Sequence, residues 1–342
     1  MSFLKQLLAY KRICIQCHNN PDADAVASAF GVYRYLISHG VEVSIVYGGE
    51  QPIKKSSMKM LLRECGIPLT HNRAPSGFEL LLLVDCQYGQ TNAERFEARE
   101  IAIIDHHIQV VEDSANYFIK SRYQSCSTIV YELLLEEGYP VEDDPELTVA
   151  FLYGLYTDTA SFADLFYEAD IAMKAELFSD QPLFERLIKS SMTVAELLVA
   201  CDAMYNHYFD VHRRFAIVGA LKCEQTVLGI IGDFMIQVDS VFLSVAYTEA
   251  GAGYQISIRS CHEKLHADKI AAYICDGVGG GGGHAKKAGG KILRLKMQEK
   301  YGGKVFSRLL KCSCAATSMK NAFSTEIIQE EGLKTAKSGN HK

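Results

Sequence analysis

The chain has 342 residues, which is too long for one ordinary compact domain and suits about two. Hydrophobic residues make up 48% of it and charged residues 22%, a globular balance that argues against wholesale disorder. The formal net charge of −6 argues against a basic surface that coats nucleic acid non-specifically.

Short apolar, β-forming runs recur along the first half of the chain, with helical patterns between them. The clearest helical pattern places Val26, Phe30, Tyr33 and Ile37 on one face and ends near Gly40. Strands are predicted at residues 12–17, 41–47, 80–84 and 101–104. The last two are continuous aliphatic runs, which is typical of strands covered on both faces. This alternation predicts an α/β fold, with an N-terminal domain built on a parallel sheet that has helices on both sides.

The second half follows a different pattern. Residues 193–212 are predicted to form a long amphipathic helix that connects two domains. A smaller α+β domain is then predicted, with a helix at 266–275 and strand-like runs at 215–221, 227–232, 241–247, 254–259 and 291–295. The expected domains are residues 1–190, a helical connector at 191–212, residues 213–311, and a polar tail at 312–342 that is partly disordered.

The location is predicted from apolar runs and cysteines. No run approaches the ~20 apolar residues of a membrane helix, and Lys5 and Gln6 interrupt the first ten residues, so no apolar signal segment is expected. The eleven cysteines are scattered. Cys14 and Cys17 form the only C-x-x-C, and strand alternation would send their side chains to opposite faces. We therefore expect reduced thiols in a cytoplasmic protein.

Acidic and imidazole side chains gather where predicted elements end. They follow three of the strands and one helical stretch: His18, Asp22 and Asp24 after the first strand, Asp85 after the third, Asp105, His106 and His107 at the fourth, and Asp158 after the helix. In an open parallel sheet the crevice at the carboxyl ends of the strands is the ligand site. Taken singly, an Asp at a strand end is most often a turn or helix cap, but the joint pattern favours a site.

Such a cluster needs cations. Converging carboxylates repel each other, and no Lys or Arg cluster accompanies them in the sequence. A mixed Asp and His set without Cys suits Mn²⁺ better than a structural zinc site, and the ligands suffice for two ions that share a carboxylate. Two ions lower the pKa of a bridging water and clamp an in-line phosphoryl displacement. The pattern therefore predicts hydrolysis of a phosphoester or phosphoanhydride.

A glycine run at residues 279–283, followed by His284, is the second landmark. Glycines let backbone N–H groups approach phosphate oxygens, and a flexible linker is the alternative interpretation. Its flanking helix and strand patterns favour a binding loop. Arg259 is a candidate anion clamp, because Arg grips phosphate bidentately, or else a solvated charge at a strand end.

These motifs, in this order, resemble the DHH phosphoesterase family with its DHH-associated C-terminal domain. Residues 18–25 resemble the first motif, Asp85 the second, Asp105-His106-His107 the third, and residues 157–159 the fourth. Residues 257–260 and the glycine run through His284 resemble substrate-binding motifs of the C-terminal domain. The most similar subgroup is the bifunctional oligoribonuclease and pAp phosphatase type (nanoRNases), with cyclic-dinucleotide phosphodiesterases as relatives.

The resemblance implies a role for each motif residue. One Mn²⁺ would be held by His18, Asp22 and Asp85, and the other by Asp24, Asp85, His106 and Asp158, with Mg²⁺ or Co²⁺ as substitutes. His107 would face the scissile phosphate and Asp105 would orient the histidines. Substrate would be bound by Arg259, Ser260, Gly281, Gly282, Gly283 and His284. The sequence departs from the family pattern at Lys287, which precedes Ala288, and at Asn19 and Asn20.

The predicted function is a Mn²⁺-dependent phosphodiesterase or phosphatase of short nucleotides, such as nanoRNA, dinucleotides or pAp. The expected partners are a short oligonucleotide or dinucleotide substrate and, as an option, a second copy in a homodimer; no membrane partner is expected. One alternative is an inorganic pyrophosphatase or exopolyphosphatase with the same N-terminal chemistry. Another is a nucleotide-binding regulator without catalysis, and a long-strand exonuclease of the RecJ type is a weaker option.

Overall fold

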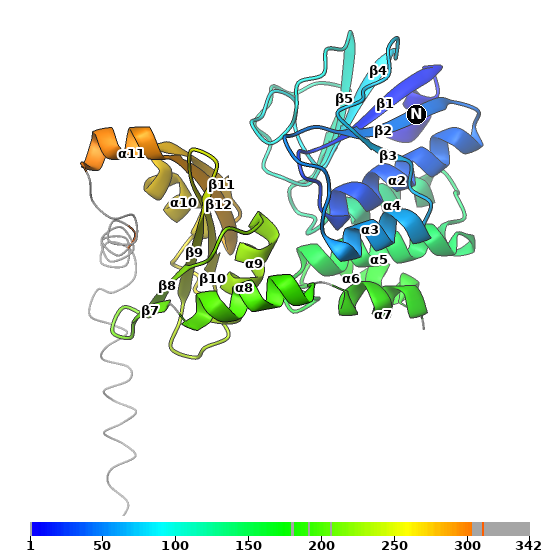
Figure 1. Ribbon diagram of the computed structural model, residues 1–342. Coiled ribbons are helices and arrows are strands. Elements are labelled where there is room, and N and C mark those ends of the chain that lie inside the picture. Colours follow the sequence, from blue (N-terminus) through cyan, green and yellow to red (C-terminus); the bar gives the residue numbers. More distant parts are fainter. Residues whose placement is uncertain (1, 179–180, 191, 206, 303–309, 311–342) are drawn as a thin grey trace, which may run out of the picture. The chain divides into compact units, whose positions relative to one another are not determined.

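The computed structural model describes residues 2–178, 181–190, 192–205, 207–302 and 310 (Figure 1). The predicted tail at 312–342 lies outside the described residues. The chain divides into two compact units, Met1–Ser191 and Met192–Lys342. Each unit has its own sheet and its own apolar core.

The N-terminal unit is built on a six-stranded sheet in which all pairs are parallel. The strands are β1 (Arg12–Cys17), β2 (Glu42–Tyr47), β3 (Leu69–His71), β4 (Leu80–Val84), β5 (Glu100–Asp105) and β6 (Tyr117–Ile119), in the order β3-β2-β1-β4-β5-β6. Strands β1, β4 and β5 are therefore neighbours at the centre. The predicted parallel sheet is confirmed, and the three-residue edge strands β3 and β6 extend it.

The helices of this unit cover one face of the sheet (Figure 1). They are α1 (Phe3–Leu7), α2 (Ala23–Ser38), α3 (Ser56–Glu64), α4 (Cys126–Glu136), α5 (Pro145–Asp158), α6 (Glu168–Leu177) and α7 (Pro182–Lys189), with a 3-10 turn, η1, at Val141–Asp143. The prediction of helices on both sides is wrong for the described residues. Loop residues such as Phe78, Ala93 and Phe96 cover the other face, because Cys14, Leu81 and their neighbours need apolar cover of any kind.

The C-terminal unit contains a mixed six-stranded sheet, as the predicted α+β character requires. Its strands are β7 (His207–Asp210), β8 (Phe215–Gly219), β9 (Leu243–Ala250), β10 (Gly253–Ser260), β11 (Gly279–Gly283) and β12 (Lys287–Leu293), in the order β11-β12-β10-β9-β8-β7. Only β8 and β9 pair in parallel. The helices are α8 (Val194–Tyr205), α9 (Gln225–Met235), α10 (Ala267–Cys275) and α11 (Arg294–Tyr301).

Three predicted elements of this unit are wrong. The predicted helix at 193–212 ends at Tyr205, and β7 follows because Tyr208 and Phe209 pack into cores on opposite faces of the sheet, with the period of a strand. The predicted strand at 227–232 lies inside α9, where Val227, Leu228 and Ile231 share a buried helical face. The glycine run is an edge strand, β11, rather than a loop.

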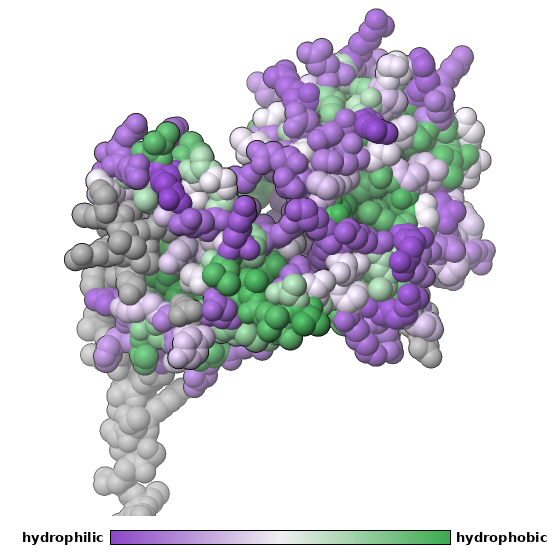
Figure 2. Space-filling model, in the orientation of Figure 1, coloured by the Kyte–Doolittle hydropathy of each residue, from purple (hydrophilic) through white to green (hydrophobic). Residues whose placement is uncertain are grey.

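No helix in the described part of the chain is long and apolar enough to span a membrane. Helix α8 carries exposed apolar residues, among them Val194 and Leu198. Figure 2 shows one face of the protein coloured by residue hydropathy.

Candidate metal centre

The three central strands of the N-terminal sheet end beside one another, and each is followed by a candidate ligand. His18 follows β1, Asp85 follows β4, and His106 follows β5. Asp85 has a φ of +60°, and its N–H donates to Ile104 O at 2.9 Å. A left-handed backbone is costly for a residue with a side chain, and such residues gather at functional sites. The left-handed backbone at Asp85 turns the chain directly after β4.

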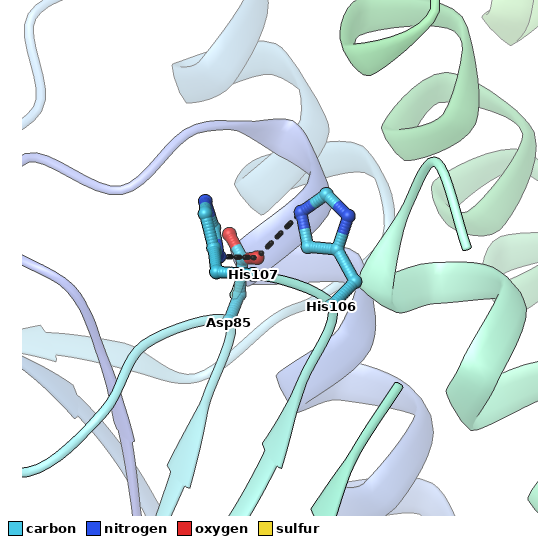
Figure 3. A group of neighbouring side chains, drawn as sticks. All are labelled: Asp85, His106 and His107. Carbon is cyan, nitrogen blue, oxygen red and sulfur yellow. Dashed lines mark ion pairs between the residues drawn. The ribbon is translucent and has the colours of Figure 1, made fainter. Parts of the chain in front are cut away.

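Asp85 lies at the middle of the cluster (Figure 3). Its Oδ2 lies 3.6 Å from His18 Nε2, and its Oδ1 lies 3.2 Å from His106 Nε2 and 3.7 Å from His107 Nδ1. Only 2% of the Asp85 side chain is exposed. Its Oδ1 receives no hydrogen bond of good geometry from the described residues. This buried oxygen therefore suits a metal ligand.

The donor atoms form three overlapping groups, and within each group all the atoms lie within 4.8 Å of one another. The groups are His18, Asp22 and Asp85; Asp24, His106 and Asp158; and Asp85, His106 and His107. Asp85 and His106 each belong to two groups. All six predicted metal ligands thus fall in these groups. The His18 and Asp24 groups share no residue, and the group of Asp85, His106 and His107 joins them.

Each of the three histidines is held through its Nδ1. His18 Nδ1 lies 3.0 Å from Asn19 O, His106 Nδ1 lies 3.1 Å from Tyr123 O, and His107 Nδ1 lies 2.8 Å from Asp105 Oδ1. Because these oxygens only accept hydrogen bonds, each Nδ1 carries the proton. In His18 and His106, Nε2 lies beside the carboxylates, and it is the ring atom that can donate an electron pair to a metal ion once its proton is lost. Metal-binding histidines are commonly held in this way.

Asp24 is fully buried in the first turn of α2, against the N-terminus of α4. Its Oδ2 accepts the N–H of Cys126 at 2.6 Å and its Oδ1 accepts the N–H of Ser127 at 2.9 Å. These amides belong to the orphan donors that begin a helix, where a carboxylate is favoured. Asp24 is therefore fixed in place by the two amides, and its Oδ2 lies 4.0 Å from His106 Nε2.

Gly154 allows helix α5 to approach this point. A Cβ at position 154 would lie 2.5 Å from Ser127 Oγ and 3.1 Å from Asp24 Oδ1, so only glycine fits without a shift. Asp158 comes one helical turn later, at the end of α5, and its Oδ2 lies 3.6 Å from His106 Nε2.

Asp105 lies behind the cluster and holds it. It is fully buried and absent from the three donor groups. Its Oδ1 accepts the N–H of His106 at 2.9 Å as well as the His107 proton, and its Oδ2 accepts the side-chain N–H of Gln87 at 2.7 Å. This arrangement orients both histidines, the role that the resemblance implies for Asp105.

The protonation equilibria reflect carboxylates packed without cations. Among the described residues, no Lys or Arg forms an ion pair with Asp22, Asp24, Asp85 or Asp158. Burial, reinforced by the charge of Asp85, raises the pKa of Asp24 to about 7, and burial also raises the pKa of Asp158. Burial disfavours the His18 cation, but Asp22 and Asp85 outweigh it and raise its pKa to about 10. Bound protons thus reduce the negative charge of the cluster, a charge that divalent cations would also neutralise.

The donor set fits divalent metal ions. It consists of carboxylate oxygens and imidazole nitrogens with no cysteine, a composition suited to Mn²⁺ rather than to a structural zinc site. The overlap of the groups at Asp85 provides a carboxylate that two ions could share.

The predicted substrate-binding residues lie together at one end of the C-terminal sheet. Arg259 pairs with Lys287 in the β10–β12 register, the Ser260 N–H donates to Lys286 O at 2.9 Å, and the His284 N–H donates to Lys287 O at 2.7 Å. Arg259 is not a solvated charge, because only 14% of its side chain is exposed and its Nε donates to Asp233 Oδ1 at 2.6 Å. The backbone of β10 at Arg259 and Ser260 and that of residues 284–287 thus lie side by side.

The glycines of β11 differ in their surroundings. A Cβ at Gly281 would lie 2.8 Å from Ala271 O and from Cys275 Sγ of α10, whereas a Cβ at Gly280 or Gly282 would meet nothing within 4 Å. Gly283 has a φ of +144° and begins the turn to His284. Gly281 therefore admits α10 to the sheet, and Gly282 and Gly283 leave their backbone exposed.

Sequence reasoning missed the residues that hold the ligands. Gln87 supports Asp105, Tyr123 O orients His106, and the Cys126 and Ser127 amides hold Asp24. The only available signal was Ser125, an N-cap whose Oγ accepts the Thr128 N–H. It predicts a helix start, but not which carboxylate approaches that start.

Comparison with known proteins gives relatives for both parts of the chain. It is 25% identical over 319 residues to cyclic-di-AMP phosphodiesterase GdpP of Geobacillus thermodenitrificans, which covers 86% of this chain and 47% of that protein. It is 30% identical over 155 residues to a probable manganese-dependent inorganic pyrophosphatase of Streptococcus mutans, with 43% of this chain and 48% of that protein covered. The chain spans about half the length of the curated relatives it matches.

Its fold is similar to that of an exopolyphosphatase-related protein from Bacteroides fragilis, with a TM-score of 0.73 and 19% identity over 92% of this chain and 97% of that one. Residues 12–157 match the model of the DHH family, N-terminal domain. That range contains His18, Asp85 and the Asp105-His106-His107 motif. Residues 12–157 are therefore identified as a DHH family N-terminal domain.

Proposed function

We propose that this protein is a metal-dependent hydrolase of phosphoester bonds in short nucleotides, with nanoRNA, linear dinucleotides or pAp as substrates and two Mn²⁺ ions as cofactors. The observation that carries the proposal is the pair of donor sets, His18/Asp22/Asp85 and Asp24/His106/Asp158, which lie side by side because Asp85 Oδ1 is 3.2 Å from His106 Nε2. In this proposal Mg²⁺ or Co²⁺ could substitute for Mn²⁺, and the protein acts in the cytoplasm.

The proposed residue roles follow from the contacts. His18, Asp22 and Asp85 would hold one ion, and Asp24, His106 and Asp158 the other. Asp85, whose Oδ1 lies 3.2 Å from His106 Nε2, would be shared with the second ion. Bound Mn²⁺ would lower the pKa of water and neutralise charge on a phosphate. Asp105 fixes the His107 ring through Nδ1, so that its Nε2 is the atom available to a phosphate or leaving oxygen. The His107 side chain is 36% exposed, which suits a residue that meets substrate.

The C-terminal unit supports a nucleotide substrate in this proposal. The backbones of Arg259, Lys286, Lys287 and His284 lie at one end of the sheet, and the exposed glycines Gly282 and Gly283 pair with the same strand, β12. N–H groups together with Arg and Lys form a phosphate-binding surface. Ser260 has a buried side chain whose Oγ lies 3.3 Å from His262 O, so its proposed contribution is to shape the strand end.

The alternative is an inorganic pyrophosphatase, which is favoured by the match to a probable manganese-dependent pyrophosphatase over 43% of the chain. The match to a cyclic-di-AMP phosphodiesterase extends over 86% of it and so includes the C-terminal unit. We therefore prefer a nucleotide substrate.

A substrate panel tests the proposal. The protein, loaded with Mn²⁺, is incubated with a linear RNA dinucleotide, a five-residue RNA, pAp, cyclic di-AMP and pyrophosphate, and products are separated by chromatography. The expected result is hydrolysis of one or more of the first three at least tenfold faster than that of pyrophosphate. Preferred hydrolysis of pyrophosphate would favour the alternative, and nucleotide binding without any hydrolysis would support a regulator.

A further inference from the structure

Asp170 is a fully buried carboxylate of α6 that belongs to none of the donor groups. Its Oδ1 accepts the hydroxyl proton of Thr128 at 2.5 Å, and its Oδ2 accepts the backbone N–H of Gln124 at 3.0 Å. A buried carboxylate is costly and remains only where donors compensate for lost water. Both of its donors belong to the segment that begins α4.

That segment also holds two of the proposed metal ligands. The N–H groups of Cys126 and Ser127 donate to the two oxygens of Asp24, and Tyr123 O accepts the Nδ1 proton of His106. The contacts of Asp170 at residues 124 and 128 lie on either side of the two amides. Asp170 thus fixes the turn from which Asp24 and His106 are positioned.

The same segment reaches the third ligand of the set. The Gln124 side chain donates to Asp164 O at 2.6 Å and accepts the N–H of Phe166 at 2.7 Å and of Tyr167 at 3.0 Å. These residues form the loop between Asp158, at the end of α5, and the start of α6. Asp24 and His106 are therefore hydrogen-bonded to this turn, and Asp158 is linked to it through the 159–167 loop. Asp170 bonds to the same turn from the adjoining helix.

We propose that Asp170 is a positioning residue for the metal ion held by Asp24, His106 and Asp158, acting through the 123–128 turn. This inference rests on the proposed function, because it requires that a metal ion binds there. A carboxylate suits the position because it accepts from Gln124 N–H and the Thr128 hydroxyl at once. Ser125 Oγ, 3.0 Å from Thr128 Oγ1, extends the network to the helix N-cap.

The test measures Mn²⁺ affinity by titration calorimetry and by the electron paramagnetic resonance signal of the free ion. Asp170→Ala removes both acceptors, and loss of a partner that orients ligands typically weakens metal binding by about 10- to 100-fold. We expect that loss for one of the two Mn²⁺ sites. Asp170→Asn should bind Mn²⁺ within about threefold of the unmodified protein, because its amide oxygen accepts from Gln124 and its NH₂ donates to Thr128 Oγ1.

Asp144→Ala is the matched control. Asp144 caps α5 by accepting the Leu147 N–H at 3.1 Å, and the 14-residue helix separates it from Asp158 by about 20 Å. Its loss should lower the melting temperature and leave Mn²⁺ affinity unchanged. If Asp170→Ala binds Mn²⁺ as tightly as the unmodified protein, the inference is overturned and the proposed function stands. If the unmodified protein binds no Mn²⁺, the proposed function itself fails.

A second pair of variants covers the case in which Asp170→Ala does not fold. Thr128→Val removes one donor to Asp170 and keeps the side-chain shape. Thr148→Val removes a buried hydroxyl that bonds to Val141 O and Asp144 O. Thr128→Val should weaken Mn²⁺ binding several-fold and Thr148→Val should not. Equal affinities in the two variants would overturn the inference.

Discussion

Oδ1 of Asp85 lies 3.2 Å from Nε2 of His106, although the 86–99 loop and strand β5 separate the two residues along the chain. Parallel pairing of β4 with β5 brings the strand ends together, with Val84 opposite Ile104. The left-handed backbone at Asp85 then turns its carboxylate toward the ring. The contact depends on register, turn and ring orientation at the same time.

Replacing Asp85 by Asn should remove Mn²⁺ binding at both sites while preserving the fold. Asn tolerates a φ of +60° and keeps the side-chain shape, but it is a poor ligand for a divalent cation. We expect affinity and dinucleotide hydrolysis to fall by about 100-fold or more. Circular dichroism checks the fold, and calorimetry measures binding. Unchanged hydrolysis by Asp85→Asn would exclude the shared-carboxylate site.

Replacing His107 by Ala should separate chemistry from metal binding. If His107 acts on the substrate phosphate, kcat should fall by about 10²- to 10⁴-fold, as for loss of a general acid. Mn²⁺ affinity should change by less than about threefold, since three other residues hold one ion and four hold the other in the proposed sets. Because His107 also lies within 4.8 Å of Asp85 and His106 donor atoms, a parallel loss of Mn²⁺ affinity would instead identify it as a ligand.

The metal-free protein should lose stability as pH rises from 5 to 9. The folded pKa of Asp24, about 7, is raised from 3.8, so its contribution is lost as pH climbs through 7. The folded pKa of His18, about 10, is raised from 6.5, so its contribution is complete below pH 6.5 and declines toward pH 10. One pKa unit equals about 1.4 kcal/mol, and we expect the melting temperature to fall by at least about 5 °C.

Mn²⁺ should reverse this trend. Its ligands must be deprotonated, so binding releases protons and tightens as pH rises from 6 to 8. Calorimetry in buffers of different ionisation enthalpy counts those protons.

Two carboxylates of the cluster do not affect how the stability of the metal-free protein depends on pH. Desolvation alone would raise the pKa of Asp22 and Asp105, but hydrogen bonds from His18 and His107 lower both pKa values, so these carboxylates stay ionised from pH 5 to 9. A melting temperature that rises with pH without metal would contradict the assignment.

Replacing Ala160 by Gly should stabilise the protein by about 1 kcal/mol, because Ala160 has a φ of +49° and glycine removes the cost of a left-handed backbone. Ala163→Gly in the same loop is the control. Residue 163 is not left-handed, so glycine there should destabilise by about 0.5–1 kcal/mol. Chemical denaturation measures both. Equal destabilisation by the two changes would show that backbone strain at residue 160 is negligible.

Replacing Gly281 by Ala should destabilise the C-terminal unit by about 1–3 kcal/mol, because the new Cβ would lie 2.8 Å from Ala271 O and Cys275 Sγ. Gly280→Ala, with nothing within 4 Å of its Cβ, should cost less than about 0.5 kcal/mol. Thermal unfolding compares the two variants. Similar melting temperatures would mean that α10 adjusts to the added methyl group.

Local pattern predicted the central strands because their physical cause is local. Residues 80–84 are aliphatic at every position, which is typical of a strand covered on both faces. The same reasoning failed at 227–232, where an apolar run is compatible with helix or strand. It also failed at β11, because glycine has no side chain from which a period can be read and its pairing with β12 is a long-range contact.

The sequence alone determined the residue types of the site and the strand ends that carry them, since parallel strands must present their carboxyl ends at one edge. Only the tertiary structure decided which atoms face each other. Asp24 accepts hydrogen bonds from two amides of α4 that lie 102 and 103 positions further along the chain. Asp170 contacts the same turn from α6. Such contacts depend on how helices pack, which no local periodicity encodes.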